Sequence, residues 1–382
     1  MSAERLPQLM VEPAALTLRW PDGASTRLDS LWLRDNRCED RDPHSGQRLI
    51  DILDLPPAPR IREAAWQADA LHVTWEDEPR GAIFALEWLA LQAAGSHRQR
   101  PELERRLWLE GASMDATRDF AWLPYKRLKN EPKARLEWLT ALLQQGMAFL
   151  SQVPCTDSGL LEAMAPLGQV SATNYGLVFD VRSVPQPENL AYSDLGLGLH
   201  TDNPYREPVP GFQSLHALLT TTEGGDSLLA DGFALAEHLR ATDPRSFEWL
   251  TSTRVPFHYR SREADLYAER PLVQLSCDGR IAAVHYNNRS IAPLPPDVAG
   301  SGEFYVAYRR FAALLREPRW QVRYRLRDGD LVMFDNQRVL HGRTAFSSAR
   351  QPRHLKGCYL SRDSVYSAVG LLRRQPAQEA QA

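Results

Sequence analysis

Short apolar segments broken by turn residues limit this chain, more than any other feature, to a fold built mainly from strands. Four such segments, rich in aromatic or β-branched side chains, occur early in the chain at 16–20, 30–33, 61–63 and 71–75. Beyond Ser171 strand-like runs again alternate with Gly, Pro, Asn and Asp. The pattern predicts an α+β fold, in which a mainly antiparallel β core carries helices on its outside.

Three segments show helical periodicity instead. Residues 135–150 place leucines on one face of a helix, and two further helices are expected at 160–167 and 304–315. An arginine-rich polar stretch near 96–106 separates the early strands from the rest of the chain. We therefore expect a small N-terminal β domain at 1–105 and a larger domain at 106–382.

Composition and charge exclude several classes of function. The 382 residues carry a formal net charge of only −3, which gives no general attraction to nucleic acid or to an anionic membrane. No apolar run approaches the roughly 20 residues of a membrane span, and the N-terminus lacks the pattern of a signal peptide. The four cysteines are scattered, which argues against a disulfide framework. We expect a cytoplasmic protein whose metal chemistry rests on histidines and carboxylates.

The sharpest local motif is His200-Thr201-Asp202. Residues i and i+2 of a strand point to one face, so the imidazole and the carboxylate can meet one metal ion, although an isolated motif of this kind can equally be a surface pair at a turn. His341 follows the apolar run 331–334 and supplies a second imidazole. Two histidines and one carboxylate form the facial triad that holds Fe(II) with positions left open. Arg353 lies twelve positions further on and can bind a co-substrate carboxylate with its planar guanidinium.

These motifs resemble those of a known family. The Fe(II)/2-oxoglutarate dioxygenases of the γ-butyrobetaine hydroxylase branch, in the taurine dioxygenase superfamily, are similar to HTDNPYREPVPGFQSLHALLTTTEGGDSLLADGF, to DNQRVLHGRTAF…RHLKGCY and to the N-terminal LWLRDN. The resemblance covers nearly the whole chain. It implies a double-stranded β-helix (jelly-roll) catalytic domain after a small β domain, and a homodimer.

The resemblance also implies the chemistry. The triad would bind Fe(II), and Arg353 would bind the C5 carboxylate of 2-oxoglutarate. Arg343 and Thr201 are further candidates for co-substrate contacts, with plain structural roles equally open. The implied reaction uses O2 to convert 2-oxoglutarate to succinate and CO2 while it hydroxylates an unactivated C–H bond.

The sequence departs from the family in its N-terminal domain. Family members commonly carry a zinc site there, built from three clustered cysteines and a later histidine. The matching stretches NRCEDRDPHSG and WEDEPRGAIF offer one cysteine and place Pro79 near the expected histidine. Cys38, His44 and His72 do not make a tetrahedral set, so zinc is not expected.

The resemblance further places an aromatic cage around a quaternary ammonium substrate, at Tyr175, Phe179, Tyr192 and Tyr359. Such a cage binds a trimethylammonium group by cation–π attraction. Each ring taken singly is explained as well by core packing, whereas the set in register with the metal motifs favours the cage. Phe179 stands where the family often has tryptophan.

The other end of the substrate is expected to be anionic. Asn189 and Asn287 match family positions that hold a carboxylate, and Asn203, Tyr205 and Arg289 are additional candidates. Arg289 is equally explained as a solvated or ion-paired loop residue. If it reaches the pocket, a phosphonate becomes a candidate anion.

Several substrates therefore remain open. The first hypothesis is hydroxylation of γ-butyrobetaine to carnitine, or of 2-trimethylaminoethylphosphonate to its 1-hydroxy product, with trimethyllysine third. The second is the same chemistry on a sulfonate or an amino acid, against which the aromatic set argues. The third is a non-catalytic methylammonium-binding protein, against which the intact triad and Arg353 argue.

Overall fold

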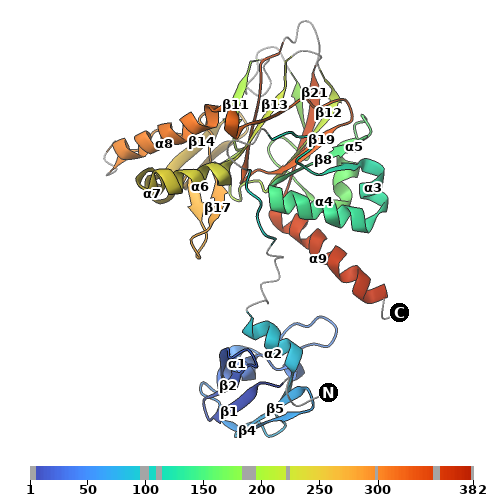
Figure 1. Ribbon diagram of the computed structural model, residues 1–382, viewed down its shortest axis with the longest axis vertical. Helices are drawn as coiled ribbons and strands as arrows, with labels where there is room; N and C mark the ends of the chain where they lie inside the picture. The colour runs from blue at the N-terminus through green and yellow to red at the C-terminus, as the bar shows by residue number, and fades with distance from the viewer. Residues whose placement is uncertain are drawn as a thin grey trace. The chain divides into compact units, whose positions relative to one another are not determined.

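The computed structural model describes residues 6–94, 103–108, 114–182, 195–220, 224–296, 300–346 and 353–379. The chain forms two compact units, 1–100 and 101–382, and each is described by itself (Figure 1). The domain boundary expected at residue 105 stays a prediction.

The N-terminal unit contains two three-stranded antiparallel sheets. The first is β1 (Gln8–Glu12), β2 (Ala15–Arg19) and β3 (Ser25–Asp29); the second is β4 (Ile61–Gln67), β5 (Ala70–Trp75) and β6 (Ala82–Ala85). The helices are α1 (Ser30–Asp35) and α2 (Leu86–Ala93). Alternate side chains of the strands, such as Leu16, Leu18 and Trp75, form one buried cluster with Leu33. The strands expected at 16–20, 61–63 and 71–75 are confirmed.

The strand expected at 30–33 is wrong, because this segment begins α1. Its buried residues are Ser30, Leu33 and Arg34, which is the i, i+3, i+4 spacing of a helix. The Trp75 indole donates a hydrogen bond to the Ser30 hydroxyl at 2.9 Å and fixes the start of the helix in the core. Four residues are too few to show this period against the strand-like composition.

Two antiparallel sheets make the centre of the larger unit, apart from one parallel pair at an edge. The larger sheet has the order β10-β21-β12-β19-β8-β7, with β9 paired to β21, and the smaller has the order β11-β20-β13-β18. Their bounds are β7 (Trp122–Pro124), β8 (Met147–Ser151), β9 (Val170–Ser171), β10 (Phe179–Arg182), β12 (Phe212–Leu219), β19 (Leu331–Asp335), β21 (His354–Leu360), β11 (Leu197–His200), β13 (Ser227–Asp231), β18 (Val322–Tyr324) and β20 (Val339–Arg343). Side chains from both sheets, such as Phe149, Phe334, Leu229 and Val339, share one core cluster. The expected α+β jelly roll is confirmed.

Helices cover this core in two groups (Figure 1). The first group packs on the larger sheet and consists of α3 (Tyr125–Asn130), α4 (Pro132–Gln145), α5 (Gly159–Met164) and α9 (Arg362–Glu379). The second group consists of the helices α6 (Gly232–Thr242), α7 (Pro244–Ser252) and α8 (Ser301–Arg316). These helices pack with two hairpins, β14 (Val255–Arg260) with β15 (Asp265–Arg270) and β16 (Val273–Leu275) with β17 (Ile281–Val284). The helix expected at 304–315 is α8, and the one expected at 160–167 is α5 with a 3-10 turn. Within the described residues, no helix is both long and apolar enough to cross a bilayer.

The helix expected at 135–150 is only partly right. It ends at Gln145, because Gly146 adopts φ +80° and its N–H bonds to the Leu142 carbonyl, as at a left-handed helix end. Residues 147–150 are fully buried and begin β8 in the larger sheet. A short apolar run buried on both faces fits a strand and a helix equally well, so periodicity could not separate the two.

Candidate metal centre and active site

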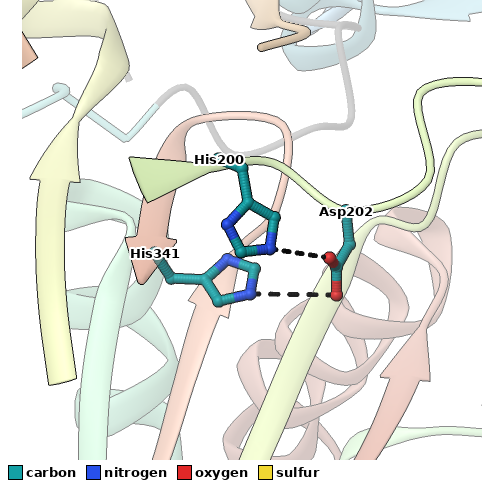
Figure 2. A group of neighbouring side chains, drawn as sticks. All are labelled: His200, Asp202 and His341. Carbon is teal, nitrogen blue, oxygen red and sulfur yellow. Dashed lines mark ion pairs between the residues drawn. The ribbon is translucent and has the colours of Figure 1, made fainter. Parts of the chain in front are cut away.

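Two strands of the smaller sheet bring the three expected metal ligands together. β11 ends at His200, and His341 on β20 lies opposite it in the antiparallel register. Asp202 follows just after β11, where the chain leaves the sheet. Figure 2 shows the three side chains converging, with His200 Nε2 at 3.2 Å from Asp202 Oδ1 and His341 Nε2 at 3.8 Å from Asp202 Oδ2. Within the described part of the chain, this is the one group of three such side chains found that could hold a metal ion.

The charge states of the triad suit a divalent ion. His200 Nδ1 lies 2.9 Å from the Gly198 carbonyl oxygen, which leaves Nε2 free to ligate. Burial lowers the pKa of His341 to about 3, so this imidazole is neutral at ordinary pH. Burial raises the pKa of Asp202, but the two histidines and the Tyr359 hydroxyl outweigh it and place the pKa below its usual value. Two imidazoles and one carboxylate on one side of a site are the donor set of the Fe(II) facial triad.

Asn336 holds the backbone of the aspartate ligand. Its Oδ1 accepts from the Asp202 N–H at 2.7 Å, and its Nδ2 donates to the Asp202 carbonyl at 3.0 Å. Asn336 is completely buried in the turn between β19 and β20, the strand that carries His341. One amide thus relates the two ligand-bearing segments. The sequence gives little sign of this residue, which is the second of two polar residues after the apolar run 331–334.

An open cavity lies against the triad. One wall is aromatic: the ring centroids of Tyr175 and Phe179 lie 6.4 Å apart, and those of Phe179 and Tyr359 lie 5.1 Å apart. The Tyr359 hydroxyl also donates to Asp202 Oδ2 at 2.8 Å, and burial raises its pKa well above 10, so it stays a neutral donor. Three of the four expected aromatic positions therefore meet beside the metal site.

Two arginines also line the cavity. Arg353 is 8% exposed and lies over the Phe346 ring at 5.6 Å. Burial, and secondly Arg343, lowers the pKa of Arg353 to about 10, so the guanidinium remains charged at neutral pH. No described residue forms a hydrogen bond or an ion pair with it. Arg343 donates to the Leu195 carbonyl at 3.3 Å.

The polar side chains after the triad also reach the cavity. Asn203 is buried, with φ +55°, and its Oδ1 accepts from the Tyr205 hydroxyl at 2.7 Å. Its Nδ2 has no partner among the described residues. Arg289 lines the cavity with an exposed side chain. Desolvation lowers the pKa of Arg289, while the nearby Asp202 carboxylate opposes that shift.

Three predicted contact residues lie outside the described cavity lining, and two further ones lie outside the described residues. Asn287 donates from Nδ2 to the Thr201 carbonyl at 3.0 Å and accepts at Oδ1 from the Arg289 N–H, so both ends of its amide serve the backbone. Thr201 is buried and accepts at Oγ1 from the Tyr286 N–H at 3.0 Å. Tyr205 supports Asn203 from outside the cavity lining. All three side chains make supporting contacts within the protein, and the substrate or co-substrate roles expected for them stay predictions. The other two, Asn189 and Tyr192, lie outside the described residues.

Two polar residues that no sequence motif singles out also line the cavity. Gln213 is 2% exposed, and its Oε1 has no partner in the described part of the chain. Ser227 lies beside Arg343 in the register of β13 and β20. Their signal is a single polar side chain at an inward position of an apolar strand, which the alternation of β12 and β13 shows only once the strand direction is known.

The expected absence of zinc stays a prediction. In the N-terminal unit Cys38 is exposed at the start of a 3-10 turn. Beside it, Arg37 lies 3.5 Å from Asp40 and 3.5 Å from Glu78, so charged groups connect this turn with the segment after β5. Arg34 lies at 3.7 Å from Asp40 and 3.9 Å from Glu78.

Comparison with known proteins covers both units. Residues 119–359 match the family described as taurine catabolism dioxygenase TauD, TfdA family. Residues 8–90 match a second family, described as gamma-butyrobetaine hydroxylase-like, N-terminal.

Curated relatives span almost the full length. A gamma-butyrobetaine dioxygenase from Pseudomonas sp. (strain AK-1) is 32% identical, with 94% of each chain covered. A trimethyllysine dioxygenase from Meyerozyma guilliermondii is 27% identical, with 96% of each chain covered. The gamma-butyrobetaine dioxygenase of Homo sapiens is 27% identical, covering 94% of this chain and 95% of its own.

Proposed function

The chain belongs to the TauD, TfdA family of dioxygenases, and from this premise we propose that it hydroxylates a small trimethylammonium zwitterion. It is an Fe(II)- and 2-oxoglutarate-dependent dioxygenase with a His200, Asp202, His341 triad. Fe(II), when bound, would activate O2, one oxygen atom of which converts 2-oxoglutarate to succinate and CO2 while the other hydroxylates a C–H bond of the substrate. The protein's own residues bind and orient the two organic substrates around that centre.

Arg353 is the proposed anchor of 2-oxoglutarate. A buried guanidinium that has no partner among the described residues is costly unless an anion joins it, and the distal carboxylate of the co-substrate meets that need. Arg343 lies on the same wall and adds positive charge there. Phe346, under Arg353, holds the planar group in place.

The aromatic wall carries the proposal for the substrate. A trimethylammonium group donates no hydrogen bond, so it is recognised by ring faces rather than by acceptors. Tyr175, Phe179 and Tyr359 offer such faces next to the triad. Asp202 is the one carboxylate in the described cavity lining, and it is engaged by Tyr359. Aromatic rings are therefore the main means by which this cavity can hold a cation.

Arg289 and Asn203 supply the proposed anion site at the other end. Both line the cavity near the triad, and the amide Nδ2 of Asn203 is a donor with no partner in the described residues. A carboxylate, as in γ-butyrobetaine, satisfies such donors. A phosphonate, as in 2-trimethylaminoethylphosphonate, carries more charge and makes fuller use of the Arg289 guanidinium. Trimethyllysine is the third candidate because it shares the cation.

The positive charge of the substrate provides the test of the cage. The tert-butyl isostere of each substrate has the same shape as the trimethylammonium group but no charge. We expect kcat/KM to be higher by about tenfold or more for each trimethylammonium substrate than for its isostere. The measurement is succinate and product formation with both members of each pair. Equal kcat/KM for a pair would show that the rings recognise shape alone and would contradict the proposal.

The anion is tested at Arg289. The Arg289→Ala variant should lose more kcat/KM with the phosphonate than with γ-butyrobetaine, because a charge-assisted hydrogen bond contributes about 1.5–3 kcal/mol. Arg289→Lys keeps the positive charge but loses the planar guanidinium that binds an anion through two hydrogen bonds. Its kcat/KM with the phosphonate should lie between those of the wild type and Arg289→Ala. Phosphonate turnover that is unchanged in Arg289→Ala would exclude the anion clamp.

A further inference from the structure

The two oxygens of the Asp202 carboxylate have different neighbours. Oδ1 lies 3.2 Å from His200 Nε2. Oδ2 accepts a hydrogen bond from the Tyr359 hydroxyl at 2.8 Å and lies further, at 3.8 Å, from His341 Nε2. The carboxylate is therefore engaged on one oxygen by a group that is not a metal ligand.

The backbone leaves Asp202 little other freedom. Asn336 bonds both its N–H, at 2.7 Å, and its carbonyl, at 3.0 Å. What remains is rotation of the carboxylate about its own side-chain bonds. The Tyr359 hydroxyl is the described group that fixes this rotation from outside the triad.

The ring and the hydroxyl of Tyr359 contact different parts of the site. It lies on β21 opposite Gln213 of β12, and its side chain points into the cavity with only 4% of the residue exposed. Its ring packs against Phe179 in the aromatic wall. The hydroxyl at the end of the same ring reaches the metal ligand.

We propose that Tyr359 is a positioning residue whose hydroxyl keeps Asp202 Oδ2 engaged, so that Asp202 offers the metal a single oxygen while the Tyr359 ring lines the substrate wall. The hydroxyl part rests on the Fe(II) site alone. The ring part rests on the proposed function. Carboxylates bind metals through one or two oxygens, and a second oxygen on the ion takes up a position that a facial triad leaves open.

The hydroxyl is tested with Tyr359→Phe, which keeps the ring. We expect Mn(II), used as a redox-stable probe of the site, to bind about tenfold or more weakly, as is typical when a partner of a metal ligand is lost. We expect more than one succinate per hydroxylated product, because 2-oxoglutarate turnover no longer stays coupled to the substrate. KM for the trimethylammonium substrate should stay close to that of the wild type.

Tyr324→Phe is the matched control, because the Tyr324 hydroxyl donates to Asp330 Oδ2 at 2.9 Å in the same unit. Its Mn(II) affinity should equal that of the wild type, and circular dichroism should show both variants folded. Mn(II) affinity and coupling that are unchanged in Tyr359→Phe would overturn the proposal.

Tyr359→Leu removes the ring and the hydroxyl together. In addition to the effects of Tyr359→Phe, it should raise KM for the ammonium substrate. Because the Mn(II) result needs no substrate, it stands apart from a failure of the proposed function.

Discussion

At the scale of single residues, the metal site depends on side chains that never touch the metal. Asn336, through its two bonds to the Asp202 backbone, holds the aspartate in register with the strand that carries His341. Residues that hold the ligands in place keep the ligand set ordered. Loss of such a residue commonly lowers metal affinity by about 10–100-fold.

Asn336→Asp tests this dependence. The variant keeps an acceptor for the Asp202 N–H but loses the donor to the Asp202 carbonyl and adds a charge. We expect Mn(II) affinity to fall by about tenfold or more, measured by titration. Gln337→Leu is the control, since its amide donates to the Val209 carbonyl at 3.2 Å in the same turn. Equal affinity in Asn336→Asp and Gln337→Leu would contradict a special role of Asn336.

The sequence singles out residues whose chemistry is explicit from their motifs, and it gives little sign of residues whose role depends on burial. The triad and Arg353 stand in motifs with a chemical meaning, and the structure brings them to one cavity. Asn287 was expected at the substrate, but its amide serves the backbone. Whether an asparagine faces a cavity or a carbonyl depends on three-dimensional neighbours that a motif does not contain.

At the scale of elements, a buried ion pair joins segments distant in the sequence. Arg338 donates to both oxygens of Asp231, at 3.1 and 2.8 Å, and both side chains are at most 2% exposed. The same guanidinium bonds the carbonyls of Arg106 and Gln144. It thus connects the segment before α4, the end of α4 and the start of α6.

Asp231→Asn should lower the free energy of unfolding by about 3–5 kcal/mol, because it leaves the Arg338 charge buried without its partner. Urea denaturation provides the measurement. Glu131→Gln, which breaks the exposed pair with Arg127 at 2.8 Å, should cost less than about 1 kcal/mol. Similar losses in both variants would show that burial of the Arg338 pair has no particular weight.

Elements were predictable where the pattern was long. The sixteen residues of α8 show a full amphipathic period and were found with nearly correct ends. The short runs 30–33 and 147–150 were assigned to the wrong class, because their final structure depends on the core that they enter. Gly146 was the local signal that α4 stops and β8 begins.

At the scale of the whole molecule, buried histidines make stability depend on pH. Burial lowers the pKa of His216 to about 4, from 6.5. Above pH 6.5 a histidine with a lowered pKa does not reduce the free energy of unfolding, because it is neutral in both the folded and the unfolded chain. As the pH falls from 6.5 towards 4 the unfolded chain takes up the proton first, so the fold is destabilised.

In His216→Leu the free energy of unfolding should therefore fall less between pH 7 and pH 4. The difference between its values at these two pH values should be smaller than in the wild type by about 3 kcal/mol. Urea titrations at a series of pH values measure it. His44→Leu changes an exposed histidine and should leave the profile as it is. Parallel profiles for the wild type and His216→Leu would show that His216 takes up its proton as readily in the folded protein as in the unfolded chain.

The most direct test of the proposed activity is the ratio of succinate to hydroxylated product with γ-butyrobetaine, 2-trimethylaminoethylphosphonate, trimethyllysine and the sulfonate taurine, each with Fe(II) and 2-oxoglutarate. We predict equal amounts of succinate and product with at least one trimethylammonium substrate and neither with taurine. Coupled turnover of taurine, or no coupled turnover of any trimethylammonium substrate, would contradict the proposed function.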